Sequence, residues 1–370
     1  MSVSKLCEEL VKANQDIEVL CTTANGLKEL NTSPGKKQLV EGVSVTYFKR
    51  LTKDHSHFSP ALLVGLNKIL TKNKSEGKQS LKACKPIMHI HAWWNLVSML
   101  SCLIGVCRGC LIILSPRGTL SNYSFSNNNG LLKFFFHNTI GKFLLERCHF
   151  HVTSLKEKKE MLALCNPKSI HVIPNFVRLP KEQFSLIKES KLFKLIFMSR
   201  IERKKGLEIL FRALEKTKIP YILTIAGTGD DKYLEELKYL SRELKIEDKV
   251  EWIGHQDDAN KFRILSEHHL FVLPSHDENF ANIVIESLSV GTAVLISEHV
   301  GLSDYVKKHK LGWIVKNDPL SFKQKIENLF VQRTLLEIIR EAAPPKIKED
   351  FDDNKLILDY LTMYNELSSY

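Results

Sequence analysis

Short β-rich runs alternate with helical patterns along almost the whole chain, and this alternation limits the possible folds more than any other feature of the sequence. Apolar runs such as 111–115 and 221–226 have the length of ordinary strands, and stretches with apolar residues at helical spacing follow them. A helix between two strands returns the chain to the same end of the sheet, so strands joined in this way pair in parallel. The sequence therefore predicts an α/β protein with parallel sheets.

The predicted elements form two series, separated by a polar stretch. A chain of 370 residues is long enough for two domains, and each series has the pattern of a Rossmann-like domain. The predicted organisation is an N-terminal domain at 1–178, a linker at 179–191, a C-terminal domain at 192–345 and a terminal helix at 346–370. A ligand is expected in the cleft between two such domains.

Positive charge is concentrated in the first half of the chain. Residues 1–190 hold 26 Lys and Arg against 13 Asp and Glu, whereas residues 191–370 hold 27 against 29. The basic half suits an anionic membrane surface or a phosphate-bearing partner, and an ordinary solvated surface is the alternative. No nucleic-acid recognition motif accompanies the charge, so a nucleic acid is not the expected partner.

Neither a membrane span nor an export signal is predicted. No apolar run reaches the roughly 18 residues that a membrane-spanning helix needs. Glu8 and Glu9 stand where a signal peptide has its apolar core. We therefore expect a cytoplasmic protein, which could lie on the inner face of the plasma membrane. Its eight Cys are expected to be reduced and mostly buried.

Basic residues and glycines follow the first two predicted strands of the C-terminal domain. Arg200 and Lys205 follow the strand at 192–198 and precede a helix. Positive side chains near a helix N-terminus suit a diphosphate, although a basic surface cluster would have the same pattern. Gly227 and Gly229 follow the next strand, where glycine lets a ligand approach the backbone closely.

The segment 276–286 is the most informative part of the sequence. Glu278 precedes a predicted helix, and Glu286 lies about two turns later on roughly the same face. Between them, the helix start at 281–283 offers backbone N–H groups to an anion. A nucleotide-sugar needs a site for its phosphates and acceptors for its hydroxyl groups. Two carboxylates on either side of a phosphate site meet this need, because each can accept hydrogen bonds from hydroxyls. Each Glu alone would equally be an ordinary helix-start or solvated carboxylate.

Together these segments resemble the retaining family 4 glycosyltransferases, whose GT-B fold has two Rossmann-like domains facing across a cleft. The resemblance is close over about 190–320 and extends to the rest of the chain by the layout of the elements. The matching residues are Ser199-Arg200, Lys205-Gly206, Gly227-Thr228-Gly229, Val250 to Gly254, Pro274-Ser275, Glu278, Glu286, Gly291 to Val294, Gly301 to Asp304 and Gly312.

The resemblance implies a donor site in the C-terminal domain. Arg200 and Lys205 would grip the donor diphosphate, Glu278 would accept hydrogen bonds from the sugar and so take part in catalysis, and Glu286 would hold the ribose. The family is usually independent of metal, so neither a metal nor another cofactor is expected. The remaining donor-site residues that the resemblance implies are Gly227, Gly229, Gly254, Phe280, Ala281, Asn282 and Ile283.

In the first domain the resemblance points to the acceptor site. His91 ends a predicted strand and is expected nearer the cleft than His89, which has the place of a core residue in the alternation. Arg117 follows the next strand, where many relatives have a catalytic His, and resembles a subgroup with a Ser-Pro-Arg-Gly loop. Because Arg stays protonated, it cannot be a general base, but it can bind a phosphate of the donor or of a lipid-linked acceptor. The terminal helix is expected to cross back onto this domain or to cap the other.

The sequence departs from the family pattern in two places. Relatives begin with a strand and a Gly-rich loop before the first helix, whereas this chain begins at that helix, so we expect a truncated N-terminus. The absent strand would leave the strands at 16–23 and 86–91 without their common neighbour. Ala281 stands where relatives often have glycine, and we expect a negative φ at this residue.

The resemblance thus implies a retaining glycosyltransferase of the hexosyltransferase type. It would transfer a sugar from a UDP- or GDP-linked donor to a hydroxyl of a glycan or lipid-linked glycan, in the synthesis of O-antigen, lipopolysaccharide or capsule. The basic first domain adds an expected contact with an anionic membrane. The alternatives are a nucleotide-sugar epimerase on the same fold and a truncated protein that binds nucleotides without turnover.

Overall fold

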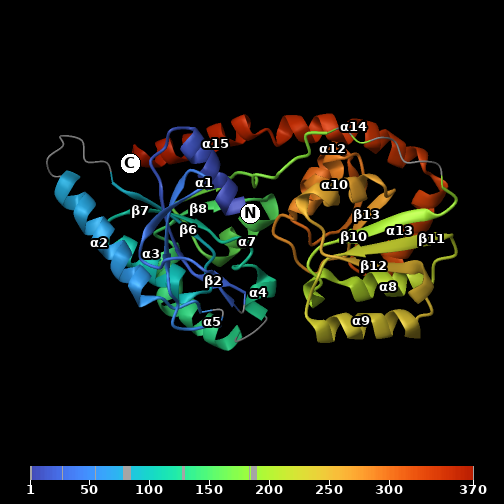
Figure 1. Ribbon diagram of the computed structural model, residues 1–370, viewed down its shortest axis with the longest axis horizontal. Helices are drawn as coiled ribbons and strands as arrows, with labels where there is room; N and C mark the ends of the chain where they lie inside the picture. The colour runs from blue at the N-terminus through green and yellow to red at the C-terminus, as the bar shows by residue number, and fades with distance from the viewer. Residues whose placement is uncertain are drawn as a thin grey trace. The chain divides into compact units, whose positions relative to one another are not determined.

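The computed structural model describes residues 2–26, 28–54, 56–77, 85–126, 130–182, 184 and 190–369. Their contacts form two compact units (Figure 1): unit 1 is Met1–Phe176 with Asp353–Tyr370, and unit 2 is Val177–Asp352. The predicted linker at 179–191 lies partly outside the described residues, and Leu179 at its start packs against the core of unit 2.

Unit 2 is built on a parallel sheet with the strand order β12-β11-β10-β13-β14-β15. This is the order of a doubly wound Rossmann sheet, and the winding reverses between β10 and β13. A ligand site is therefore expected at the carboxyl ends of these two strands. The strands are β10 (Phe193–Met198), β11 (Tyr221–Ala226), β12 (Val250–Gly254), β13 (Leu270–Leu273), β14 (Ala293–Ser297) and β15 (Gly312–Val315).

Helices cover both faces of this sheet (Figure 1). Helices α8, α9 and α13 pack together on one face, and α10, α11 and α14 pack together on the other. Two separate helices follow β15, because α13 ends at Val331 and α14 begins at Thr334. The helices are α8 (Leu207–Glu215), α9 (Asp231–Glu243), α10 (Asp258–Ser266), α11 (Asn282–Ser289), α12 (Ser303–His309), α13 (Pro319–Val331) and α14 (Thr334–Asp350).

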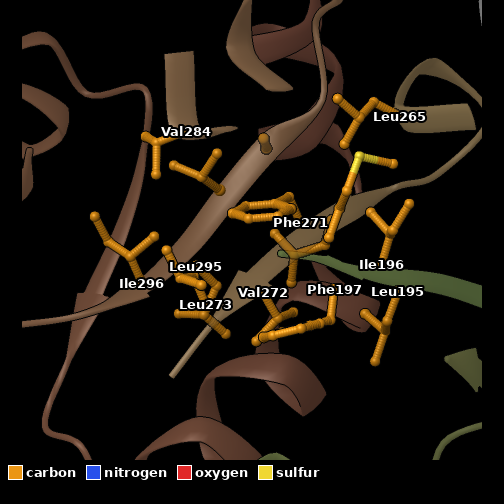
Figure 2. Packing of buried hydrophobic residues seen from close by; sticks show 14 of the residues in the cluster. Leu195, Ile196, Phe197, Leu265, Phe271, Val272, Leu273, Val284, Leu295 and Ile296 are labelled. Atoms are coloured by element: carbon orange, nitrogen blue, oxygen red, sulfur yellow. The ribbon is translucent and has the colours of Figure 1, made fainter. Parts of the chain in front are cut away.

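The two central strands of unit 2 are apolar on both faces. Leu195, Ile196 and Phe197 of β10 lie beside Phe271, Val272 and Leu273 of β13, and all are fully buried (Figure 2). Such a run without alternation is expected for a parallel sheet covered on both sides. The buried strands hold the loops that follow them in fixed positions.

Unit 1 contains two larger sheets. In the first, with the order β1-β5-β4, β1 and β5 are parallel and β4 is antiparallel. The second is parallel, with the order β6-β7-β8-β9. Among the described residues, β1 and β6 are thus edge strands of separate sheets. They correspond to the predicted strands at 16–23 and 86–91, which were expected to lack their common neighbour. The strands are β1 (Glu18–Thr22), β4 (Lys37–Val40), β5 (Val43–Phe48), β6 (Ile87–His91), β7 (Leu111–Ser115), β8 (His149–Val152) and β9 (Ser169–Val172), with a short hairpin of β2 (Ala24–Asn25) and β3 (Lys28–Glu29).

The last helix of the chain, α15 (Asp353–Ser368), belongs to unit 1 and packs against α1 (Ser2–Lys12). Leu6 and Leu10 of α1 share a core with Leu356 and Met363 of α15. The terminal helix therefore returns to the first domain, one of the two places expected for it. The other helices of unit 1 are α2 (Pro60–Gly77), α3 (Leu96–Arg108), α4 (Asn122–Ser126), α5 (Gly130–Phe136), the π-helix η1 (His137–Gly141), α6 (Lys142–Leu145) and α7 (Leu155–Leu164). None of the helices in the described ranges has the length and apolarity needed to cross a bilayer.

Candidate functional site

Lys205 and Glu278 form an ion pair where the winding of the unit 2 sheet reverses. Lys205 lies in the loop after β10 and Glu278 in the loop after β13, so neighbouring strands deliver both to the same edge. Their side chains are only 10% and 13% exposed. Lys204 makes a parallel contact, with its Nζ 3.1 Å from Oδ2 of the buried Asp277. When a ligand binds at this edge, the lysine can pair with a phosphate of the ligand in place of the carboxylate. The carboxylate can then accept a hydrogen bond from a hydroxyl of the ligand.

Glu286 lies one turn into α11 and pairs with Lys261 of α10. Lys261 Nζ is 2.8 Å from Glu286 Oε1 and 2.9 Å from Asp258 Oδ1. Burial raises the pKa of Glu286, and the charge of Lys261 opposes that rise. Lys261 was not among the predicted site residues, because the helix that carries it was not predicted. The N-cap Asp257 and the apolar pair Phe262 and Leu265 were the signals available for that helix.

The glycines after β11 allow two chain segments to approach each other. A Cβ on Gly227 would lie 1.9 Å from the Ser199 carbonyl oxygen, and one on Gly229 would lie 2.1 Å from that of Ile201. Ile201 N–H donates to the Thr228 carbonyl at 2.8 Å and completes this contact. The glycines therefore fix the loop that leads to Lys205, in addition to any access they give to a ligand.

Ala281 has a φ of +68°, so the expectation of a negative φ at this position was wrong. It is the N-cap of α11, and its carbonyl accepts a hydrogen bond from Val284 N–H at 2.9 Å. The left-handed conformation turns the chain from the Glu278 loop into the helix within a few residues. For an L-residue with a Cβ this conformation costs about 1–2 kcal/mol.

We predict that Ala281→Gly stabilises unit 2 by about 0.5–1 kcal/mol, because glycine removes the strain but adds freedom to the unfolded chain. Chemical denaturation measures the change. Ala259→Gly, at an exposed position of α10, is the matched control and should destabilise by about 1 kcal/mol. A loss of stability in Ala281→Gly would contradict the assigned backbone conformation.

The other predicted donor residues surround the same edge less closely. Arg200 is 78% exposed on its side chain and pairs with Glu202 at 2.8 Å. Gly254 has a φ of +67°, and its carbonyl accepts from Gly227 N–H at 2.7 Å. Phe280 is buried in the core, so only its backbone could meet a ligand. Asn282 and Ile283 form the first turn of α11.

The two site residues predicted in unit 1 lie at the ends of neighbouring strands. His91 ends β6, and its ring lies tilted against that of His89, with centroids 4.3 Å apart. Among the described residues, His91 Nδ1 is buried without a hydrogen-bond partner. Arg117 follows β7 with a φ of +55° and donates to Asn175 Oδ1. Burial, and then the charge of Arg117, holds the pKa of His91 well below 6.5.

His89 belongs to a buried chain of hydrogen bonds that the sequence did not predict. His151 Nε2 is 2.9 Å from the Ile173 carbonyl, which can only accept, so Nε2 carries the proton and Nδ1 accepts from Ser115 at 2.7 Å. Ser115 Oγ then accepts from His89 Nε2 at 2.7 Å, and His89 Nδ1 accepts from Tyr364 Oη at 2.7 Å. With both histidines neutral, every polar side-chain group in this hydrogen-bond chain has a partner. Tyr364 comes from α15, which thereby holds the end of β6.

We predict that unit 1 loses stability as pH falls below about 6.5, the ordinary pKa of His. The pKa values of His89, His91 and His151 are lowered, first by burial. Below about pH 6.5 these histidines are therefore protonated in the unfolded chain but not in the folded chain. The free energy of unfolding falls by roughly 1.4 kcal/mol per histidine per pH unit until the pKa of the folded state is reached. Urea unfolding between pH 7.5 and 5.5 measures this slope. His89→Asn should reduce the slope, the exposed His255→Asn in unit 2 should not, and a slope of zero in the unmodified protein would contradict the prediction.

No cluster of His, Cys, Asp or Glu able to hold a metal ion occurs among the described residues. The ion pairs of unit 2 and the hydrogen-bonded histidines of unit 1 place polar groups at or near strand ends.

The second half of the chain is similar to known proteins. Residues 180–345 match the family model of the glycosyl transferases group 1. The chain is 27% identical over 200 residues, 53% of either protein, to an N-acetylgalactosamine-N,N'-diacetylbacillosaminyl-diphospho-undecaprenol 4-alpha-N-acetylgalactosaminyltransferase of Campylobacter jejuni. Other relatives are named for lipopolysaccharide core, colanic acid and capsular polysaccharide biosynthesis. The chain spans about half the length of the curated relatives it matches.

Solved structures extend the likeness to nearly the whole chain. Sucrose-phosphate synthase of Thermosynechococcus elongatus has a TM-score of 0.75 and 17% identity, over 99% of this chain and 92% of that one. HepE of Anabaena, solved with UDP and glucose, has a TM-score of 0.69 and 14% identity, over 96% of this chain and 100% of that one. Both likenesses concern the fold, and the predicted fold class is confirmed. Residues 180–345 are therefore similar to the glycosyl transferases group 1, and the chain as a whole has the GT-B fold that these solved structures share.

Proposed function

We propose that the protein is a retaining glycosyltransferase that takes its sugar from a nucleotide-diphosphate donor, UDP- or GDP-linked, bound by unit 2. The observation that carries the proposal is two largely buried Lys–Glu pairs near strand ends of a doubly wound sheet. Lys205–Glu278 joins the loops after β10 and β13, and Lys261–Glu286 joins α10 to α11 close to the N-termini of these helices. Nucleotides bind such sheets at the strand ends where the winding reverses.

Each charged group of this site suits one part of the donor. Lys205 and the exposed Arg200 supply positive charge to the diphosphate, and the N-terminus of α11 adds its backbone N–H groups. Glu278 accepts hydrogen bonds from the sugar hydroxyls. Glu286 accepts them from the ribose, with Lys261 keeping its carboxylate ionised. HepE of Anabaena, with the same fold, was solved with UDP and glucose, which supports a nucleotide-sugar here.

The proposed reaction proceeds on one face of the sugar. The bond between the anomeric carbon and the diphosphate oxygen breaks, and the acceptor hydroxyl forms its bond from the side the diphosphate leaves. The acceptor proton passes to the leaving phosphate oxygen, so no protein base is required. Lys205 stabilises the charge that develops on the diphosphate, and for this reason we propose that neither a metal nor another cofactor takes part.

Unit 1 is the proposed acceptor domain. Arg117 is held by Asn175, while its Nε has no hydrogen-bond partner within the described part of the chain. It suits an anionic group, such as the phosphate of a lipid-linked glycan, and His91 suits a sugar hydroxyl beside it. The relatives named for lipopolysaccharide, colanic acid and capsule support a glycan acceptor in surface polysaccharide synthesis. A lipid-linked acceptor also requires contact with a membrane, which we place at its cytoplasmic face.

A transfer assay tests the proposal. The protein is incubated with a panel of UDP- and GDP-sugars and a polyprenyl-diphosphate-linked glycan, and the product is analysed by mass spectrometry and by NMR of its anomeric proton. We expect a glycan longer by one sugar, with the anomeric configuration of the donor. A product of inverted configuration would overturn the retaining mechanism. Isomerised sugar nucleotide formed without acceptor would favour an epimerase, and bound nucleotide without turnover of any donor would favour a degenerate transferase.

A further inference from the structure

Three of the 19 Phe residues of this chain are exposed, and all three lie in one segment of unit 1, 134–143. Phe134 is 65% exposed, Phe135 69% and Phe143 48%, and Ile140 between them is 51% exposed. The remaining Phe residues are buried or half-buried. We call Phe134, Phe135, Ile140 and Phe143 the phenylalanine patch. Exposed aromatic residues in such a group mark an interaction surface.

The π-helix η1 brings members of the phenylalanine patch onto one face. It joins α5 to α6, and its extra residue is seen in the hydrogen bond from Lys142 N–H to the His137 carbonyl, five residues back. Two turns across it therefore take about eight residues rather than seven. Phe135 and Phe143, eight residues apart, thus point in nearly the same direction. The opposite face of α6 is closed by Leu144 and Leu145, which are fully buried.

Three polar side chains of this segment donate hydrogen bonds to its own backbone. Asn138 Nδ2 donates to the Phe134 carbonyl at 2.9 Å, and Thr139 Oγ1 donates to the Phe135 carbonyl at 3.0 Å. Arg147 Nη1 donates to the Phe143 carbonyl at 2.9 Å. These three hydrogen bonds can persist when the face enters an apolar medium.

The charge around the phenylalanine patch is positive. Arg147 lies with its guanidinium 3.4 Å above the Phe143 ring, and the side chain of Lys142 is 53% exposed. Between residues 130 and 147 the only acidic residue is Glu146. Unit 1 as a whole has 24 Lys and Arg against 14 Asp and Glu. Aromatic groups flanked by cations fit the boundary between acyl chains and anionic head groups.

We propose that the phenylalanine patch docks unit 1 on an anionic lipid bilayer. Phe135 and Phe143 enter the boundary of the acyl chains, and Lys142 and Arg147 stay at the level of the head groups. The inference deepens the membrane contact that the proposed function requires and rests on it for its purpose, but lipid binding itself needs no turnover.

Vesicle sedimentation tests this docking. We expect the protein to bind vesicles of phosphatidylcholine with about one third phosphatidylglycerol, and to bind pure phosphatidylcholine roughly tenfold less. Phe135→Ser with Phe143→Ser should lower binding to the anionic vesicles by about tenfold or more, because each ring loses its apolar burial. The control is Leu320→Ser with Val331→Ser in unit 2, which are 60% and 79% exposed and should change nothing.

Further arms separate the possible outcomes. Glu286→Gln should bind vesicles like the unmodified protein, because lipid binding does not depend on the donor site. Failure of the donor-site proposal can therefore be told apart from failure of the docking proposal. Thermal unfolding shows whether the Phe variant is folded, and Phe135→Ser alone offers a milder change. Unchanged vesicle binding by the folded double variant would overturn the proposal. So would a dimer of the unmodified protein that becomes a monomer in the variant, because a second copy would then cover the phenylalanine patch.

Discussion

Replacing Glu286 with glutamine should weaken nucleotide binding about tenfold or more. The carboxylate is 13% exposed on its side chain and held by Lys261 at 2.8 Å. In the proposed complex it accepts two ribose hydroxyls, and a hydrogen bond to a charged acceptor contributes about 1.5–3 kcal/mol. Calorimetric titration of the nucleotide measures the loss. Glu267→Gln, exposed at the end of α10, is the matched control and should bind like the unmodified protein.

The pH dependence of this binding gives a sharper test of the same carboxylate. Because burial raises the pKa of Glu286, nucleotide affinity should fall with decreasing pH earlier than for an exposed Glu. Lys261→Met removes the charge that opposes the rise, so the loss of affinity should move to still higher pH. If the pH dependence of nucleotide affinity were unchanged in Lys261→Met, the carboxylate of Glu286, which pairs with Lys261, would not be the group on which nucleotide binding depends.

Replacing Lys205 with methionine should reduce transfer by about 10²–10³-fold, with a smaller effect on nucleotide affinity. The reason is that the charge on the diphosphate grows as the glycosidic bond breaks, and the loss of one preorganised donor typically costs this much. Turnover and nucleotide affinity are measured separately for Lys205→Met and Lys205→Arg. The arginine variant should recover part of the turnover because it keeps the positive charge.

A structural role of Lys205 must be separated from its role toward the donor. Lys205→Met leaves Glu278 buried without its cation, which destabilises unit 2. Adding Glu278→Gln should restore stability but not turnover. If the double variant recovered turnover as well, the pair would serve the fold alone.

Sequence patterns predicted which loops of unit 2 lie close together better than they predicted which side chains pair there. The strands β7 and β11 have the bounds of the apolar runs 111–115 and 221–226, because such runs mark strands locally. The carboxyl ends of parallel strands meet at one edge, so the proximity of the loops carrying Lys205 and Glu278 follows from topology. The pairing of Glu286 with Lys261 depends on how two helices pack, and no local pattern records that.

The remaining surprises concern backbone conformation and contacts between distant segments. The positive φ of Ala281 opposes the preference of its residue type, and tertiary contacts impose it. Residues 130–145 are helical, but the π-turn within this segment is not encoded by apolar periodicity. The alignment of Phe135 and Phe143 therefore could not be predicted from the sequence. The chain from Tyr364 through His89 to His151 joins residues more than 200 positions apart. Only the fold brings them together.

The most direct test of a nucleotide-sugar site in unit 2 is a calorimetric titration of UDP, GDP and ADP into the full chain. We expect one of the three to bind at micromolar concentration, with a stoichiometry of one per chain and no added metal. Binding of none of them by a protein whose folding is verified would contradict the donor site built from Lys205, Glu278 and Glu286.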